Sequence, residues 1–321
     1  MADRLYATAT GCSSIEAVTV SDSHASPTAQ ATVTCLSSSL DVGDSISIDI
    51  GYTGNHQRVF AGYVKNVQKS QSPTRYEITC ANAMIRAVDY FIVSSNPNTP
   101  YSRTNIKAET LVGQLMAMAG LTNYSGSSTS FTFATNGIPL EVNVTSVYDY
   151  CKMIASLLAW HIYADDNGKV WFKNRPPYPS GDSSVATLDD TNLVQASYWR
   201  SDRDLRNRIV VYGYGGIYAQ AQASSPYLPG GFYKSVLVGG GNVISSQSMA
   251  SQTASYNLAA LNRLTVGGSA SAIGDPAINC RSCVQVNKSD IGMSGQFYVF
   301  SLEHSWSKDG YLTNMELRKE G

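Results

Sequence analysis

The chain carries little charge for its length. Only 15% of its 321 residues are Asp, Glu, Lys or Arg, against roughly 25% in ordinary soluble proteins. The 23 basic and 24 acidic residues leave a net charge of -1. No basic excess indicates a nucleic-acid-binding surface, and no acidic excess indicates a disordered tail. The polar surface must therefore come from Ser, Thr, Asn and Gln.

Long hydrophobic runs and targeting signals are also missing. The first residues, MADRLYATATGC, contain no apolar run of the kind that a signal peptide needs. No stretch approaches 18 consecutive apolar residues, so we expect no membrane span. Without a secretory signal, free thiols are the default for the six scattered cysteines. These are Cys12, Cys35, Cys80, Cys151, Cys280 and Cys283.

Motifs for catalysis are few. No serine stands in a G-x-S-x-G elbow, and no H-E-x-x-H occurs. The sequence does not exclude a nucleophile activated by histidine, of the Ser–His or Cys–His type, because four histidines are present. They are His24, His56, His161 and His304. His161 lies between Trp160 and Ile162, where a core or interface role is commoner. A carboxylate pair for glycan hydrolysis has no local signature, so the sequence leaves that class open.

Several short motifs have a functional and a structural interpretation, and we favour the structural one. Cys280 and Cys283 have the spacing of half a zinc site, but such a site needs a second ligand pair, so we expect two reduced, metal-free thiols. The glycine-rich segments 213–216 and 239–241 lack the Lys and Ser/Thr of a phosphate loop and are expected to be turns.

Several aromatic and acidic side chains also have both a functional and a structural interpretation. Asp165 and Asp166 are more simply a hairpin turn than a carboxylate pair. Four aromatic residues on expected strands have the shape to stack sugars or bases, but such residues more often lie in cores and interfaces: Tyr198, Trp199, Tyr212 and Tyr214. We therefore expect no catalytic residue, no bound metal and no cofactor.

The strongest pattern lies between Ser146 and Lys173. Ser146 followed by Asp149 predicts a helix start, a capping box with Asp in place of Glu. Apolar residues then recur at helical spacing and form one stripe: Val147, Tyr150, Cys151, Ile154, Leu157 and Leu158. Two segments of β-formers flank the turn DDNG at 165–168, so a hairpin follows the helix. A Pro-rich exit at 175–179 closes the unit.

Short alternating strands with turn signals flank this unit on both sides, which favours a sandwich or barrel. Before it, we expect strands near 15–20, 29–36, 44–50, 59–67 and 75–80, and a helical turn over 81–90. After it, we expect strands near 196–200, 206–214, 235–238, 279–286, 295–306 and 311–318, and a loop over 219–231.

Two further helices are predicted. One covers 105–120, with Asn105 as its cap, and the apolar residues Ile106, Leu111, Leu115 and Met118 near one face. The other covers 248–265. The chain also contains 20 Tyr, and many Tyr with little charge suit a protein whose surface is largely covered by other subunits. A neutral, Ser/Thr-rich β protein explains the composition equally well.

Several stretches, taken in order, resemble the phage tail baseplate hub family of the late-control protein D type, which is related to the hub half of type VI secretion spike proteins. VFAGYV at 59–64 is similar to a strand of the family's first barrel, and YEITCAN at 76–82 to the next strand, which usually ends in Asp where this chain has Asn82. The helix and hairpin at 147–172 and the strand RNRIVVYG at 206–213 resemble later segments. YVFSLEHSWSKDGYLTNMEL at 298–317 resembles the closing hairpin.

This resemblance implies a β-rich α+β fold with two tube-type β-barrel domains and an α/β insert between them. The expected domains are a first tube-type barrel at 1–94, an insert with two helices and a hairpin at 95–178, and a second tube-type barrel with one helix at 179–321.

The resemblance also implies a structural role without catalysis. It implies a homotrimer that adapts a sixfold tail tube to a threefold spike and encloses the cargo channel, in the tail baseplate of a virion made in the host cytoplasm. Expected partners are the tail tube protein, a central spike or tail-tip protein, and wedge or distal tail proteins; DNA would pass without specific binding. Two alternatives stay open: a tail-associated cell-wall hydrolase, and a tail-tip module that binds a receptor or glycan.

Overall fold

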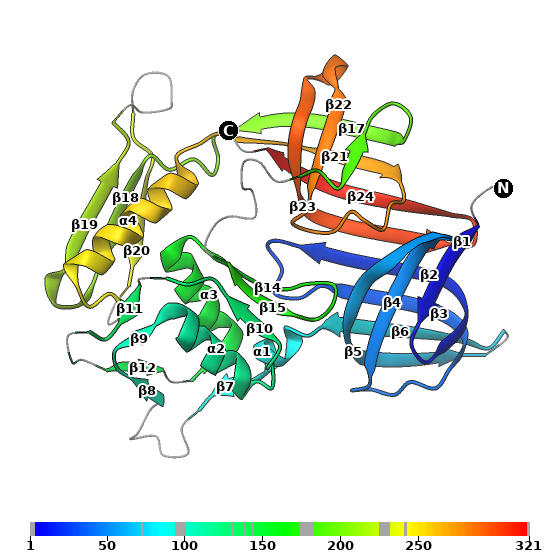
Figure 1. The fold of residues 1–321 in the computed structure, drawn as a ribbon, viewed down its shortest axis with the longest axis horizontal. Helices are drawn as coiled ribbons and strands as arrows, with labels where there is room; N and C mark the ends of the chain where they lie inside the picture. The colour runs from blue at the N-terminus through cyan, green and yellow to red at the C-terminus, as the bar shows by residue number, and fades with distance from the viewer. Residues whose placement is uncertain are drawn as a thin grey trace.

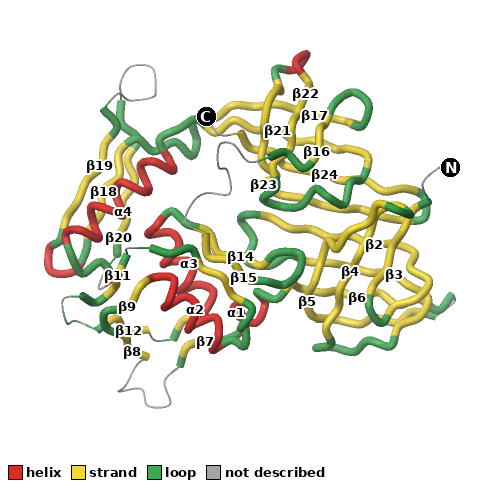
Figure 2. The backbone as a smooth tube through the Cα atoms, in the orientation of Figure 1, coloured by secondary structure: helices red, strands yellow, loops and turns green. Residues whose placement is uncertain are grey.

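The computed structural model describes residues 4–319 apart from 72, 94–100, 130, 136, 138, 143, 174–182, 225–231 and 241–242. The predicted Pro-rich exit at 175–179 lies outside the described residues. Strands dominate one side of the molecule, and the α-helices gather on the other (Figure 2). The expected β-rich α+β fold class is confirmed.

The first strand group holds six antiparallel strands in the order β1-β4-β5-β6-β3-β2. They are β1 (Leu5–Ala9), β2 (Cys12–Ser23), β3 (Gln30–Ser38), β4 (Ser45–Tyr52), β5 (Asn55–Ser70) and β6 (Arg75–Asn82). The alternation predicted for 44–50 is present in β4, because Ile46, Ile48 and Ile50 are all buried in the core of this group.

The second strand group comes from the last half of the chain. Its strands are β16 (Ala186–Leu188), β17 (Leu193–Ser201), β21 (Thr265–Ile273), β22 (Cys283–Lys288), β23 (Met293–Ser307) and β24 (Gly310–Lys319). The closing hairpin predicted at 295–318 is β23 with β24, and it carries buried residues of both cores: Phe297, Leu302 and Leu317 in the second group, and Trp306 and Tyr311 in the first.

The two strand groups are joined into one sheet. β2 pairs antiparallel with β23 from Ala17 opposite Ser307 to Ser23 opposite Ser301. The resulting 12-stranded sheet runs β1-β4-β5-β6-β3-β2-β23-β24-β21-β17, and β22 and β16 branch from β23. Figure 1 shows the early and late strands side by side at this seam. Segments nearly 300 residues apart thus form one continuous surface.

Strand β21, which lies between β17 and β24, was not predicted from the sequence. Its sequence, TVGGSASAI, lacks the bulky β-formers that mark a strand. A Cβ atom at Gly268 would clash with the carbonyl oxygen of Ser197 on β17. The strand therefore needs glycine because two neighbouring backbones approach it closely.

The α/β insert follows the first strand group. Its helices are α1 (Ile85–Asp89), α2 (Ala108–Met118) and α3 (Val147–Leu158), and its three-stranded sheet holds β10 (Tyr124–Gly126), β15 (Val170–Lys173) and β14 (His161–Ala164). Three two-stranded pairs complete it: β7 (Phe91–Ile92) with β13 (Thr145–Ser146), β8 (Tyr101–Arg103) with β12 (Leu140–Val142), and β9 (Ile106–Lys107) with β11 (Thr132–Phe133).

The predictions for α3 and its hairpin are confirmed. The Ser146 hydroxyl accepts a hydrogen bond from the Asp149 N–H at 3.0 Å and donates one to the Asp149 carboxylate at 2.7 Å. The whole predicted apolar stripe of the helix is buried. β14 and β15 then pair antiparallel across the turn at 165–168. Local signals were sufficient here because cap, stripe and turn all agree.

The prediction for α2 was wrong at its start, whereas the helix ends within two residues of the predicted end and is followed by Gly120 in the left-handed region, with φ of 75°. The helix begins at Ala108, after an uncapped Lys107, because Ile106 and Lys107 pair with β11 as a short strand. Asn105 takes no capping role and lies instead in the left-handed region, with φ of 48°. Met118, expected near the buried face with Leu111 and Leu115, is 36% exposed.

Residues 208–261 also differ from the expectation for a single second barrel over 179–321. They form a separate sheet of β19 (Tyr218–Gln222), β18 (Arg208–Tyr212) and β20 (Ser235–Gly239), covered by α4 (Gln247–Leu261). Short 3₁₀ turns lie at Tyr214–Gly216 and Ser289–Ile291. Buried residues of this unit, including Ile209 and Met249, share one core with the α/β insert, and α4 contacts α3.

Part of this unit was expected to be a loop. Residues 218–222 pair with β18 as β19, although 219–231 was predicted to be irregular. Its alternating Ala and Gln residues, YAQAQ, carry little strand propensity. Residues 225–231 lie outside the described part.

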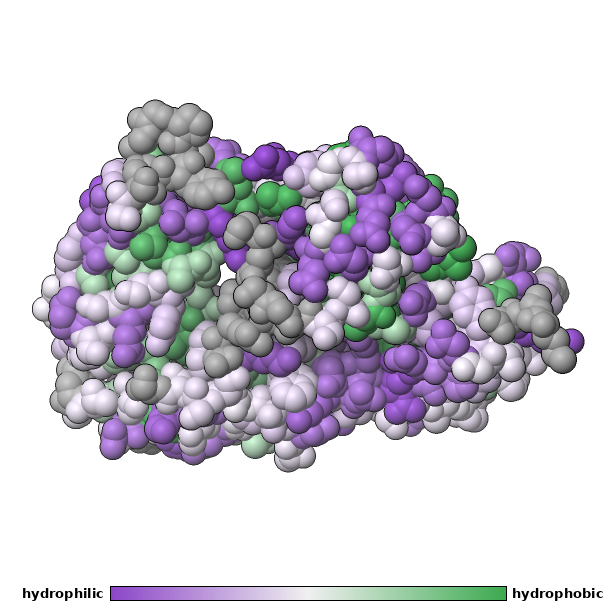
Figure 3. Space-filling view, turned by 45° about the horizontal axis from the view of Figure 1, so that its top comes forward, coloured by the Kyte–Doolittle hydropathy of each residue, from purple (hydrophilic) through white to green (hydrophobic). Residues whose placement is uncertain are grey.

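In Figure 3, hydrophilic and hydrophobic residues are interspersed over the visible face of the molecule.

Candidate functional site

A polar surface covers one face of the continuous sheet at the seam between the two strand groups. In β2, Val18 and Val20 point into the first core, so Thr19 and Ser21 lie on the opposite face. In β23, Leu302 and His304 are buried, so Ser301 and Glu303 lie on the same opposite face.

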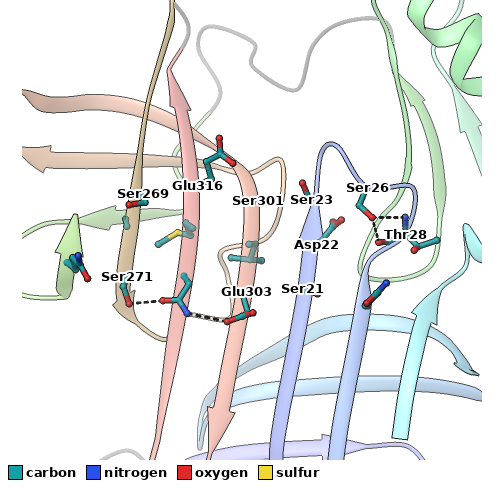
Figure 4. A pocket seen from close by; sticks show the side chains of 16 residues that line it. Ser21, Asp22, Ser23, Ser26, Thr28, Ser269, Ser271, Ser301, Glu303 and Glu316 are labelled. Carbon is teal, nitrogen blue, oxygen red and sulfur yellow. Dashed lines mark hydrogen bonds between the residues drawn. The ribbon is translucent and has the colours of Figure 1, made fainter. Parts of the chain in front are cut away.

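β24 and β21 continue this pattern. Met315 and Ala270 are buried in the second core. The residues next to them in the chain lie on the other face and are polar. Together with the polar residues of β2 and β23, they form the surface called here the polar sheet face: Ser21, Ser23, Ser301, Glu303, Asn314, Glu316, Ser269 and Ser271. Figure 4 shows these side chains along four adjacent strands.

Hydrogen bonds run across the strands of the polar sheet face. The Ser271 hydroxyl donates to the Asn314 side-chain oxygen at 2.8 Å, and the Asn314 amide donates to the Glu303 carboxylate at 3.4 Å (Figure 4). The hydroxyls of Ser197 and Ser269 are 2.8 Å apart. Because the side chains satisfy one another, the face is held in a defined arrangement without an apolar cover.

A cavity of about 680 Å³ lies over this face, and its described lining residues include three carboxylates and no Lys or Arg. The carboxylates belong to Asp22, Glu303 and Glu316. Arg318 lies two residues beyond Glu316 on β24 and pairs with it at 2.9 Å. The surface is therefore polar and weakly acidic, because two of its three carboxylates, those of Asp22 and Glu316, are each paired with an arginine.

A buried junction at one end of the polar sheet face connects the three parts of the fold. Arg281, in the turn before β22, pairs with Asp22 at the end of β2 with 2.6 Å between Nη1 and Oδ2. It also donates to the Ser23 carbonyl oxygen at 3.3 Å and lies over the Tyr163 ring of the insert hairpin at 4.4 Å. One side chain thus contacts both strand groups and the insert.

Two of the candidate histidines meet at the same junction. His24 Nε2 and His161 Nδ1 are 2.5 Å apart, and the His24 ring stacks on Phe300. Burial lowers the pKa of His24 to about 3 and that of His161 to about 2. Both rings are therefore neutral near pH 7, and one donates its proton to the other. His161 has the interface role that the sequence favoured.

His304, within the closing-hairpin motif, is a buried structural residue. Its Nε2 is 2.9 Å from the Ile278 carbonyl oxygen, so this nitrogen carries the proton. Its Nδ1 then accepts from the Tyr311 hydroxyl at 2.8 Å. Burial lowers the pKa of His304 to about 4. The fourth candidate, His56, stacks on Tyr6 and lies opposite Gly51 in the β4–β5 hairpin.

The remaining candidates have structural surroundings. Asp165 accepts hydrogen bonds from the N–H groups of Asn167 and Lys169 and from the Trp171 indole, as a turn residue does. Cys280 and Cys283 are buried, and neither forms a disulfide with a described residue; Cys280 lies in a turn, and only Cys283 is in β22. Burial raises the pKa of Cys280.

The four candidate aromatic residues do not come together. Tyr198 packs against the second core, and Trp199 lies on β17 beneath the Arg318 guanidinium. Tyr212 and Tyr214 are exposed at the far end of the molecule, by β18. Within the described ranges, no group of three or more His, Cys, Asp or Glu side chains is arranged for a metal ion.

Sequence reasoning missed the polar sheet face and the Asp22–Arg281 pair. The signal for the face was the strict alternation in SLEHSW at 301–306, where every second residue is polar. No local pattern could have revealed the pair, because 259 positions separate its members. Among the described helices, none has the length and apolar character to cross a membrane.

Comparisons with known proteins show the fold. No protein-family model matches the sequence, and no curated protein matches it. A tail protein from Neisseria meningitidis MC58 superposes with a TM-score of 0.72 at 12% identity, over 100% of this chain and 98% of that one. The 43 kDa tail protein of prophage MuSo2 from Shewanella oneidensis superposes with a TM-score of 0.69 at 15% identity, over 98% of each chain.

A third solved structure comes from a secretion machine. It is an Escherichia coli component of the type VI secretion system, described as similar to the bacteriophage T4 tail proteins gp27 and gp5. Its TM-score is 0.60 at 11% identity, over 98% of this chain and 77% of that one. The chain therefore shares, over nearly its full length, a fold found in phage tail proteins and in a type VI secretion component.

Proposed function

We propose that this protein is the hub of a phage tail or tail-like injection machine, and that three copies close a ring around a central channel. In this proposal, the two strand groups of each copy are tube-type barrels within the domains 1–94 and 179–321, so that the ring presents six similar units. A sixfold tail tube then sits on one face of the ring, and a threefold spike or tail-tip protein on the other.

The observation that carries the proposal is the polar sheet face, which spans both strand groups. A polar face without an apolar cover suits the wall of a water-filled channel. The Glu303 carboxylate, which pairs with no cation among the described residues, repels phosphate, and the Ser and Asn side chains bond to one another or to water. A lining of Lys and Arg would instead bind a polyanion with a strong dependence on salt. DNA or another cargo thus passes without specific contacts.

The ends of the sheet supply a way to join copies. β1 and β17 end the main path of the described sheet, and β16 ends its branch; each of these three strands has one neighbouring strand. Free N–H and C=O groups along a strand edge invite another strand. We propose that edge pairing between neighbouring copies continues the sheet around the channel, and that apolar and Tyr contacts of a permanent interface support it.

The fold shared with two tail proteins, one of them from a prophage, and with a type VI secretion component supports this role. The protein would be made in the host cytoplasm and would lie in the tail baseplate of the virion, where wedge or distal tail proteins are further partners. No step of this function needs catalysis.

Charge reversal on the polar sheet face tests the proposal. A variant with Ser21, Ser301 and Asn314 all replaced by Lys should bind duplex DNA, with an affinity that falls as salt rises, whereas the native chain should bind none. Particles carrying the variant should deliver cargo more slowly. A control with three Lys substitutions at exposed positions outside the sheet face, Thr53, Thr122 and Ser128, should assemble and deliver normally. Normal delivery by the first variant would contradict a channel role for this face.

A further inference from the structure

No described element covers one face of the sheet formed by β19, β18 and β20. α4 packs on the side that holds Ile209 and Val211, so the residues between them point outward. These outward residues are called here the tyrosine face: Val210 and Tyr212 on β18, Tyr218 and Gln220 on β19, and Leu237 on β20. Tyr212 lies opposite Tyr218 with ring centroids 5.2 Å apart, and Val210 lies between Gln220 and Leu237.

The tyrosine face is exposed and nearly uncharged. Leu237 is 64% exposed and Tyr212 50%. At its edge, the Arg208 guanidinium is held by the Gln220 side-chain oxygen at 3.0 Å. Large exposed apolar and Tyr residues on one sheet face are typical of a surface that another protein covers.

A second surface on the same chain is hollow. A groove of about 390 Å³ lies between the loop after β3, strand β5 and helix α1. We call it the Tyr90 groove, and its principal lining residues are Val42, Tyr63, Ile85, Arg86 and Tyr90. Val42 and Tyr90 are exposed at its rim, although both are large apolar or aromatic residues.

Charge at the Tyr90 groove favours an aromatic occupant. Lys65 is paired with Asp89 at 3.2 Å, whereas Arg86 forms no ion pair with a described residue and lies over the Tyr63 ring at 4.1 Å. An exposed guanidinium attracts the electron-rich faces of further Tyr rings. The tyrosine face offers such rings and no carboxylate.

We propose that the tyrosine face of one copy of this chain packs over the Tyr90 groove of the next copy. This inference rests on the ring proposed above. A ring of identical copies joined head to tail needs two different, complementary surfaces on each subunit, and contact between them buries both at once. One surface is an exposed sheet face rich in Tyr. The other is hollow and holds the Arg86 guanidinium, which forms no ion pair with a described residue.

Mixing two interface variants tests this contact. Leu237→Glu and Tyr90→Glu should each weaken self-association at least tenfold in light scattering, because each places a carboxylate in an apolar contact. Leu36→Glu, at an exposed position on β3, is the matched control and should assemble like the native chain. An equal mixture of the two interface variants should form one-to-one pairs, since one intact face and one intact groove remain, but no closed trimer.

A direct link provides the second measurement. A Leu237→Cys, Tyr90→Cys chain should form disulfide-linked trimers under mild oxidation, whereas either single Cys variant should not. If the native chain forms trimers and both Glu variants assemble equally well, the proposed contact is wrong but the ring still stands. The same conclusion follows if the mixture of the two variants fails to pair. A native chain that stays monomeric alone and with the tube protein would overturn the ring itself.

Discussion

Asp22 and Arg281 form an ion pair across 259 positions of the chain, with 2.6 Å between Oδ2 and Nη1 and side chains only 11% and 9% exposed. The pair ties the end of β2 to the turn before β22, and so fixes the seam on which the polar sheet face is built. The contribution of this buried pair to the free energy of unfolding can be compared with that of an exposed ion pair.

Arg281→Met should destabilise the protein by about 3–5 kcal/mol, because it leaves the Asp22 carboxylate buried without its partner. The matched control is Arg58→Met, which removes the exposed pair with Asp49 at 3.1 Å and should cost at most about 1 kcal/mol. Urea unfolding of both variants gives the comparison. Equal effects would mean that the seam does not depend on this junction.

Leu157→Ala should lower the free energy of unfolding by about 2–5 kcal/mol, because Leu157 lies in the largest core, on the buried stripe of α3. Met118→Ala, at the exposed end of α2, should change it by roughly half a kcal/mol or less. A Leu157 variant that unfolds at the native denaturant midpoint would show that α3 does not organise the insert.

Stability should fall as pH drops from about 6.5 towards 4. The pKa of His304 is lowered to about 4 by burial, whereas an unfolded His titrates near 6.5. Between these values the unfolded chain binds the proton and the folded chain does not, so each such group costs about 1.4 kcal/mol per pH unit in this window. His304→Gln should make the slope shallower by about that amount in unfolding measured at pH 7, 6, 5 and 4. An unchanged slope would contradict a buried neutral imidazole.

Cys280 and Cys283 should be reduced and metal-free in the purified protein. Both thiols are buried, and burial raises the pKa of Cys280, so little thiolate is present for a metal or an alkylating reagent. Iodoacetamide at pH 8 should leave them unmodified until the protein is unfolded in urea. Stoichiometric zinc in elemental analysis would contradict this prediction and favour a metal site at these cysteines.

Features set by neighbouring residues were predictable from the sequence. The cap of α3 needs only Ser146 and Asp149, and its buried stripe needs only helical spacing. The β14–β15 turn and the β23–β24 hairpin are likewise local. In each case, propensity, pattern and turn chemistry agree over a few residues.

Features set by distant partners were not predictable. β21 is a strand because β17 and β24 flank it, although its residues are small. α2 starts late because Ile106 is recruited by β11. The unit at 208–261 leaves the second strand group because Ile209 and Met249 find their core against the insert. The polar sheet face exists only because β2 meets β23, a pairing without a local signal.

The central claim is that three copies surround a channel with their polar sheet faces turned inward. An electron microscopic reconstruction of the assembled particle tests it most directly. We expect three copies at the centre of the baseplate, between the tube and the spike, with Ser301 and Asn314 lining an open channel. Six independent copies at the outer edge, or a central ring whose channel is lined mainly by Lys and Arg, would contradict the account.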